Sequence, residues 1–373
     1  MTDLPRANRV QHWPAFDGVR AISLLVIIAF HANYPTFLSG GFAAVDVFFV
    51  LSGFLITWLL VNEHDRYGAI SYSKFYARRA LRLFPALAAV IVGVVILVLA
   101  YHSLAPYRPL TLHGLPYVIL YVGNWDIAFG SVLTLGLLGI TWTLAIEEQF
   151  YLLWPLVLNK LLRRMDRRRI ARFLILTAVA EMLLRAAIYL FFPGHWIVAQ
   201  YSTVTHSDGL LLGSALALMW TCRDEWKHWD VIEKHGDFLG VAAVAGWALV
   251  FFAGHQGFHQ VFIWTTLSVL ATVTLLVHLL LRPKSWISYV LEIRPLQWIG
   301  KRSYGCYLWH LSVIAVLDTI SIPGGHPHFE RFVLDLAGTF VIAAISYRLV
   351  ELPFLNRKVR FARVREEPAP ATG

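Results

Sequence analysis

The chain has 373 residues, of which 58% are hydrophobic and only 15% are charged, whereas about 25% of the residues of a soluble domain are charged. So much apolar side chain cannot be buried within one 42.3 kDa globule, and a mean hydropathy of +0.60 indicates a chain embedded in a lipid bilayer. The composition excludes a soluble enzyme and a disordered protein, and two cysteines are too few for a disulfide-stapled secreted domain.

Ten apolar segments are long enough to cross about 30 Å of hydrocarbon. They are predicted near 15–33, 41–61, 83–101, 143–162, 171–192, 207–221, 238–254, 261–281, 303–321 and 332–350. The stretch at 110–140 holds two apolar parts that are too short for a full span, which predicts re-entrant or half-membrane helices on the outer side. The expected fold is an all-α polytopic membrane protein with about ten transmembrane helices.

Lysine and arginine are distributed unevenly between the two sides that ten spans define. Of the 32 basic residues, 27 fall in segments on the side of the N-terminus, and only Arg108 and Arg331 fall in loops on the opposite side. Because cytoplasmic loops are enriched in these residues, both termini are expected in the cytoplasm, in a multi-pass protein of the cytoplasmic (inner) membrane. This topology accounts for the net charge of +9, and no nucleic-acid partner is expected.

The spans divide the chain into a cytoplasmic N-terminal segment at 1–14, a transmembrane domain at 15–353 and a cytoplasmic tail at 354–373. The first span carries Asp17 and Arg20, and no small-residue cleavage pattern follows it. It is therefore expected to be a retained anchor rather than a signal peptide.

The first span also places a basic residue and a histidine on one face. Arg20 and His31 are separated by a step of 11 residues, which turns an α-helix by about 1100° and rises about 16 Å. Asp17, one turn from Arg20, is its expected ion-pair partner. Two interpretations stay open: both residues belong to a functional site, or Arg20 reaches the headgroups while His31 lies at the outer interface.

The span that begins near 143 carries two adjacent carboxylates, Glu147 and Glu148, which a bilayer tolerates only beside a partner or a wet cavity. Thr143, Glu147 and Tyr151 share one face at helical spacing. Glu147 is expected at the depth of His31, where a carboxylate that orients and charges an imidazole would create a general base. The alternative is a polar contact between helices without chemistry.

Arg79 and Arg82 lie one turn apart at the start of the third span. They are either a positive-inside stop signal or a binding site for the phosphates of a cytosolic nucleotide-bearing donor.

Gly209 and Gly213 have the spacing of tightly packed helices, and His310 is expected to be a hydrogen-bonded core residue. The polar residues expected to support a site are Asp17, Asp46, Ser52, Thr143, Glu148, Tyr151, Asp208, Tyr304 and His310. No metal site is expected.

Five motifs, taken in order, resemble the integral-membrane acyltransferase 3 family. They are Phe-Asp-Gly-Val-Arg20 with His31, Asp46 to Thr57, Arg79-Ala-Leu-Arg82, Trp142 to Tyr151 and Ser303 to His310, and the closing Val350-Glu351-Leu-Pro353 also matches. The resemblance covers Phe16 to Pro353. It implies transfer of an acyl group, commonly acetyl from acetyl-CoA, to a hydroxyl of a sugar, a lipid-linked glycan or a secondary metabolite. It further implies that His31 is catalytic, that Arg20 is essential beside it, and that Arg79 and Arg82 act in donor binding.

The chain departs from the family pattern at two places. Thr143 stands where serine is usual and keeps a hydroxyl, whereas His206 and Ser207 stand where an arginine often precedes the Asp-Gly-Leu of the sixth span. The acceptor contacts expected at that arginine are therefore unassigned. Many members also carry a fused extracytoplasmic esterase-like domain, so an acyl relay of that kind would involve a separate extracytoplasmic partner protein.

The expected activity is transfer of an acyl group, expected to be acetyl, from cytosolic acyl-CoA to a hydroxyl of a glycan, glycolipid or secondary metabolite at the extracytoplasmic side. Acyl-CoA is expected as a co-substrate, and no tightly bound cofactor is expected. His31, tuned by Glu147, would be either the general base or a transient acyl carrier. The alternative is a proton-coupled exporter that uses His31, Glu147 and Arg20 as a relay, although no inverted repeat is visible in the sequence.

Overall fold

The computed structural model describes residues 9–10, 12–34, 36–255, 261–320, 327–358 and 365–366. Within these ranges the chain is almost entirely helical, as predicted. The β-structure of the described residues is one parallel pair of two-residue strands, β1 (Arg9–Val10) and β2 (Arg365–Glu366).

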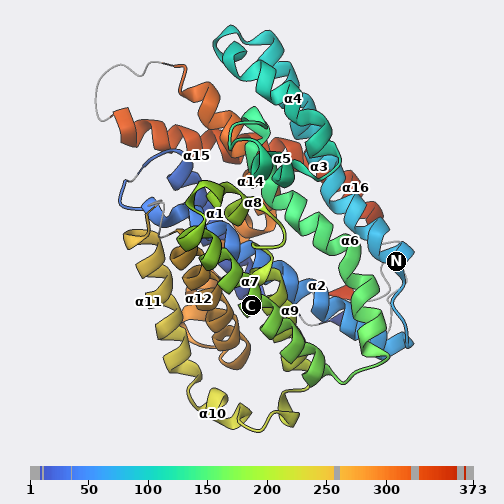
Figure 1. Ribbon diagram of the computed structural model, residues 1–373. Coiled ribbons are helices and arrows are strands. Elements are labelled where there is room, and N and C mark those ends of the chain that lie inside the picture. Colours follow the sequence, from blue (N-terminus) through green and yellow to red (C-terminus); the bar gives the residue numbers. More distant parts are fainter. Residues whose placement is uncertain are drawn as a thin grey trace.

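Ten helices of the described chain overlap the ten apolar segments (Figure 1). They are α1 (Pro14–His31), α2 (Val45–Tyr67), α3 (Tyr72–Ala100), α6 (Trp142–Leu162), α7 (Arg167–Phe191), α9 (Asp208–Thr221), α11 (Gly236–Ala253), α12 (Val261–Leu281), α14 (Arg294–Leu317) and α15 (Pro327–Ser346). Seven membrane-spanning candidates in the described chain are long and apolar enough by themselves. The helices α6, α9 and α14 are not among these seven, so the chain is a multi-pass membrane protein in which ten crossings stay a prediction.

The connecting elements are short. They are η2 (Ser39–Ala44), η3 (His102–Tyr107), α4 (Arg108–Ile119), α5 (Gly123–Phe129), η4 (Gly136–Thr141), η5 (Pro193–His195), α8 (Trp196–Tyr201), η6 (Arg223–Glu225), α10 (Trp229–Lys234), α13 (Trp286–Leu291), the π-helix η7 (Tyr347–Glu351) and α16 (Leu352–Lys358). Figure 1 shows α4 and α10 at opposite ends of the helical bundle. The elements α4, α5 and η4 occupy the stretch at 110–140, and each is shorter than the roughly 20 residues of a full span.

Local sequence explains where the helices around the site begin and end. Pro14 stands in the first turn of α1, where its missing N–H costs no hydrogen bond. Helix α2 ends at Gly68, whose φ of 67° gives the left-handed cap that glycine adopts without a steric penalty. Helix α3 begins at Tyr72, only a few residues later, so α2 and α3 are joined by a tight connection.

The helices pack closely where glycine removes a side chain. A Cβ atom on Gly53 of α2 would overlap the carbonyl of Leu210 on α9, and one on Gly213 of α9 would overlap the carbonyl of Val50 on α2. The prediction of tight packing at Gly213 is thereby confirmed. Helices α1 and α14 approach equally closely, because a Cβ on Gly300 would overlap the carbonyl of Asp17. These contacts join α2 closely to α9, and α1 closely to α14.

Candidate functional site

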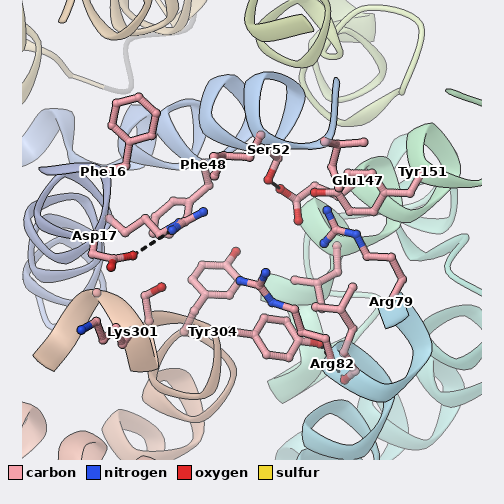
Figure 2. Close-up of a pocket in the computed structure, with 18 of the residues that line it drawn as sticks. Phe16, Asp17, Phe48, Ser52, Arg79, Arg82, Glu147, Tyr151, Lys301 and Tyr304 are labelled. Carbon is pink, nitrogen blue, oxygen red and sulfur yellow. Dashed lines mark hydrogen bonds and ion pairs between the residues drawn. The ribbon is translucent and has the colours of Figure 1, made fainter. Parts of the chain in front are cut away.

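A cavity of ≈ 470 Å³ lies among α1, α2, α3, α6, α14 and η7. Nine of the polar residues singled out in the sequence line it: Asp17, Arg20, Ser52, Arg79, Arg82, Thr143, Glu147, Tyr151 and Tyr304. Figure 2 shows most of these side chains projecting into one space from different helices. The cavity also reaches His12, Lys301 and Leu355, which lie on the side that the charge distribution predicts to be cytoplasmic.

Arg20 projects into this cavity from α1. Its Nη1 donates to Oδ1 of Asp17 at 3.0 Å, and Asp17 also lies 3.5 Å from Nε2 of His12. The predicted ion pair one turn apart is therefore confirmed. A side chain that is paired and lines a cavity is not extended toward the headgroups, so the placement favours the functional interpretation of Arg20.

Arg79, which is half-buried, and Arg82, which is exposed, both line the cavity. Helix α3 begins at Tyr72. At a rise of 1.5 Å per residue, Arg79 lies about 10 Å and Arg82 about 15 Å along the helix axis from its first residue. The Arg79 guanidinium lies 4.1 Å from the ring centroid of Tyr151, a cation–π contact that orients it. Their presence in the cavity favours ligand binding over a simple stop signal.

Glu147 belongs to this arginine-lined cavity. Ser52 donates a 2.6 Å hydrogen bond to its Oε1, and Arg79, Arg82 and Arg20 all act on it electrostatically. Figure 2 shows the carboxylate facing the Arg79 side chain. Glu147 is thus an anionic group that orders the guanidinium groups and the hydroxyl around it.

The expected pairing of Glu147 with His31 is wrong. Among the described contacts, Nδ1 of His31 lies 3.0 Å from the carbonyl oxygen of Ile27 and 3.3 Å from Nε2 of His310. Helix α6 begins only after the partly buried segment η4, so its first turn already lies within the protein. Five residues further along, Glu147 reaches the level of the arginines instead of that of His31.

His31 and His310 form a pair from α1 and α14. Their ring centroids are 5.0 Å apart, His310 is fully buried, and His31 is half-buried. Among the described residues, neither histidine lines the arginine cavity. His310 is a hydrogen-bonded core residue, as predicted, but its partner is the histidine that the sequence singles out for catalysis.

Three residues that line the cavity meet at Tyr307, which also contacts His310. We call them the tyrosine layer: Phe48, Thr143 and Tyr307. The Tyr307 hydroxyl lies 2.9 Å from Thr143 Oγ1 and donates to the carbonyl of Ile140 at 2.9 Å. The Tyr307 ring lies 5.5 Å from the His310 ring and 6.4 Å from the Phe48 ring. Tyr307 was missed among the predicted site residues, although it stands in the Ser303–His310 motif.

Comparison with known sequences identifies the family of the chain. A family model described as an acyltransferase domain matches residues 13–351. The chain belongs to the acyltransferase 3 family. It is 34% identical over 354 residues to "Peptidoglycan O-acetyltransferase OatA" of Listeria monocytogenes, a match that covers 91% of this chain and 55% of that protein. It is 33% identical over 363 residues to "O-acetyltransferase OatA" of Staphylococcus aureus, covering 93% of this chain and 58% of that protein.

A "Putative O-acetyltransferase" of Staphylococcus aureus is 33% identical over an alignment of 383 positions, which covers 97% of this chain and 60% of that protein. This acyltransferase therefore spans between 55% and 60% of the length of these curated relatives. No solved structure matches the chain at a significant level. The family resemblance inferred from the five motifs is confirmed.

Two predicted supporting residues of the acyltransferase lie outside the cavity, in a buried ionic network. Arg185 of α7 donates to both carboxylate oxygens of Asp208, each at 2.9 Å, and also to the Thr205 carbonyl. Nε2 of His206 lies 2.7 Å from Oδ1 of Asp46. All four ionisable side chains are fully buried, so Asp46 and Asp208 join α2, α7 and α9 rather than face the cavity.

This network includes His206, one of the positions at which the chain departs from the family pattern. The family pattern often has an arginine at this place, and here a guanidinium reaches Asp208 from Arg185 on the neighbouring helix. The pairing was missed because a sequence does not reveal which partner a charge within a span will meet. Glu148, a third predicted supporting residue, does not line the cavity.

The cavity wall also contains residues that sequence reasoning passed over. Tyr347 and Glu351 line it from the π-helix η7, a geometry that often occurs at functional sites. The intramembrane charge of Glu351 and its place in the closing motif were the available signals. Within the described ranges, no group of three or more His, Cys, Asp or Glu residues is placed to hold a metal ion.

Proposed function

We propose that this acyltransferase moves an acyl group, expected to be acetyl, from cytosolic acyl-CoA to a hydroxyl of a cell-envelope glycan. The observation that carries the proposal is the convergence of Arg20, Arg79 and Arg82 on one cavity. The names of the relatives, one of which is a peptidoglycan O-acetyltransferase, favour a peptidoglycan sugar over a glycolipid or a secondary metabolite as acceptor.

The chemistry of the cavity fits a phosphorylated donor. Guanidinium groups form bidentate, charge-assisted hydrogen bonds with phosphate oxygens, and coenzyme A carries a diphosphate and a separate phosphate. A volume of ≈ 470 Å³ lies within the range of about 300–1,000 Å³ that small-molecule sites occupy. Acyl-CoA would bind as a co-substrate from the cytosolic side, with its thioester arm directed toward the tyrosine layer.

The reacting group is assigned to His31, which lies about 16 Å along α1 from Arg20. An extended pantetheine arm covers a distance of this order. In one route the imidazole takes the proton of the acceptor hydroxyl while the hydroxyl oxygen attacks the thioester carbonyl and the thiolate leaves. In the other, the imidazole nitrogen attacks first and carries the acyl group until the acceptor hydroxyl displaces it. Both routes place the acceptor at the extracytoplasmic end of α1.

Glu147 has a different role from the one expected from the sequence. Its contacts with Ser52 and the arginines suit it to hold the guanidinium groups in place before the donor binds. The exporter alternative needs a relay that joins His31, Glu147 and Arg20. The described partners of Glu147 and His31 do not join them, and the family match favours an acyltransferase.

The test is transfer from radiolabelled acetyl-CoA by the purified protein in lipid nanodiscs, with peptidoglycan fragments as acceptor. His31→Ala is expected to lower transfer at least 100-fold, since a positioned base contributes about 10²–10⁴-fold. Arg169→Ala is the matched control, because Arg169 is exposed on α7 and its loss should leave transfer unchanged. Wild-type protein that leaves the thioester intact with every glycan, glycolipid and metabolite tried would refute the proposal.

A further inference from the structure

The contacts of the histidine pair show where its protons lie, because three of its four ring nitrogens have a partner of known character. Nδ1 of His310 lies 2.5 Å from the carbonyl oxygen of Tyr307, and Nε2 lies 3.3 Å from Nδ1 of His31. Nδ1 of His31 lies 3.0 Å from the carbonyl oxygen of Ile27. Two of these three contacts therefore end on backbone carbonyl oxygens, which accept hydrogen bonds and never donate them.

The positions of the protons follow from these contacts. Because the Tyr307 carbonyl only accepts, Nδ1 of His310 must carry a hydrogen, and in a neutral imidazole its Nε2 is then an acceptor. The Ile27 carbonyl likewise requires a hydrogen on Nδ1 of His31. That hydrogen lies between two acceptors, the Ile27 oxygen and Nε2 of His310, so both partners favour the same tautomer of His31.

We propose that His310 is a positioning residue that holds His31 in the tautomer with a protonated Nδ1, leaving Nε2 as the reacting atom. This inference rests on the proposed function, in which His31 acts on the acceptor or the acyl group. The lone pair of Nε2 takes the acceptor proton, or it forms the bond to the acyl carbon as the thiolate leaves. In both cases the ring becomes positively charged, and its Nδ1–H donates more strongly to Ile27 and His310.

Helix cohesion alone does not account for a histidine at position 310. Helices α1 and α14 already meet by direct backbone approach at Gly300 and Asp17, near the opposite end of α1. A fully buried polar ring in a membrane helix is expensive unless it is satisfied, and an apolar side chain would fill the same volume. The buried imidazole instead supplies an acceptor at the one atom of His31 that fixes its tautomer.

Two substitutions of His310 separate this role from packing. His310→Gln keeps an acceptor oxygen near the place of Nε2, whereas His310→Asn keeps a donor near the place of Nδ1 and loses that acceptor. Asn is expected to lower kcat about 10–100-fold, the range for a misplaced catalytic group, with an unchanged KM for acetyl-CoA because the arginine cavity is untouched. Gln should restore kcat to within a few-fold of wild type. Equal losses in both variants, or an unchanged kcat in Asn, would overturn the proposal.

A second readout does not depend on turnover. Solid-state nitrogen NMR of protein labelled at histidine distinguishes protonated from unprotonated ring nitrogens, and His31→Ala identifies the His31 signals by difference. Nδ1 of His31 is expected to be protonated and Nε2 unprotonated in the wild type, with a mixture of tautomers in His310→Asn. An unprotonated Nδ1 in the wild type refutes the tautomer assignment. Absence of transfer by a wild type that shows the expected spectrum refutes the proposed function instead.

Discussion

The buried pair of Arg185 and Asp208 permits a quantitative prediction of stability. The guanidinium makes four hydrogen bonds at 2.9 Å, to two carboxylate oxygens of Asp208, the carbonyl of Thr205 and the hydroxyl of Thr266. Hydrogen bonds that involve a charge contribute about 1.5–3 kcal/mol each, but burial of both ions offsets much of that sum. Removal of one partner from a buried ion pair costs about 3–5 kcal/mol, because the other charge stays buried without compensation.

Arg185→Met is therefore expected to lower the free energy of unfolding by about 3–5 kcal/mol. Adding Asp208→Asn to the Arg185→Met variant removes the buried carboxylate that has lost its partner, while keeping the shape of the side chain. The double variant should regain at least about 2 kcal/mol over Arg185→Met, because apolar or neutral replacements of a whole buried pair are often nearly neutral. Asp46 also acts electrostatically on Arg185, so recovery in the double variant is expected to be incomplete.

The measurement is unfolding in mixed micelles as the fraction of denaturing detergent is raised, followed by tryptophan fluorescence for the wild type, both single variants and the double variant. The coupling free energy is the difference between the double variant and the sum of the singles. Arg169→Met, an exposed site on the same helix α7, controls for the loss of an arginine as such. Strictly additive effects, or an Arg185→Met variant within about 1 kcal/mol of wild type, would contradict this account of the network.

Three further outcomes follow from the geometry. Replacing both Arg79 and Arg82 with lysine keeps the charge but removes the bidentate hydrogen-bond donors. The KM for acetyl-CoA is expected to rise about 10-fold or more, with the membrane orientation unchanged. An unaltered KM would favour the stop-signal interpretation. Gly53→Ala forces a Cβ against the Leu210 carbonyl and should cost about 1–3 kcal/mol of unfolding free energy, whereas a thermal midpoint equal to wild type would refute the close contact. Ala32→Cys should react with membrane-impermeant thiol reagents from outside the cell, and reaction only from the cytosol would reverse the predicted side of the acceptor.

Sequence patterns predicted which residues line the site more successfully than they predicted which residues contact each other. The spacing from Arg20 to Asp17 lies within one helix, where the geometry of the α-helix fixes the contact, and the structure contains that pair. The prediction that Glu147 pairs with His31 counts depth from the start of a span. That count depends on how far the preceding short helices enter the protein, which periodicity does not encode.

Contacts between helices from distant parts of the chain were the hardest to predict. The bond from Arg185 to Asp208 depends on which faces α7 and α9 present to each other, and many pairings of buried charges satisfy the same composition. Tyr307 was overlooked for a different reason: an aromatic residue in an apolar span is most often part of the core. Its hydroxyl contact with Thr143 becomes visible only when α6 and α14 are placed together.

The tyrosine layer also bears on the leakage of ions across the membrane. If donor and acceptor enter from opposite faces, as proposed, the protein must still not conduct protons and ions, since the voltage across the membrane drives other work. The Tyr307 ring contacts the Phe48 ring at the arginine cavity and the His310 ring beyond it, and the Tyr307 hydroxyl is hydrogen-bonded to Thr143 and Ile140. Apolar rings oppose the passage of a hydrated ion, which would have to lose its water beside them, whereas an uncharged acyl group of a few atoms carries no such shell. If the proposed function is right, the rings between the donor and His31 would also limit the leakage of ions through the protein.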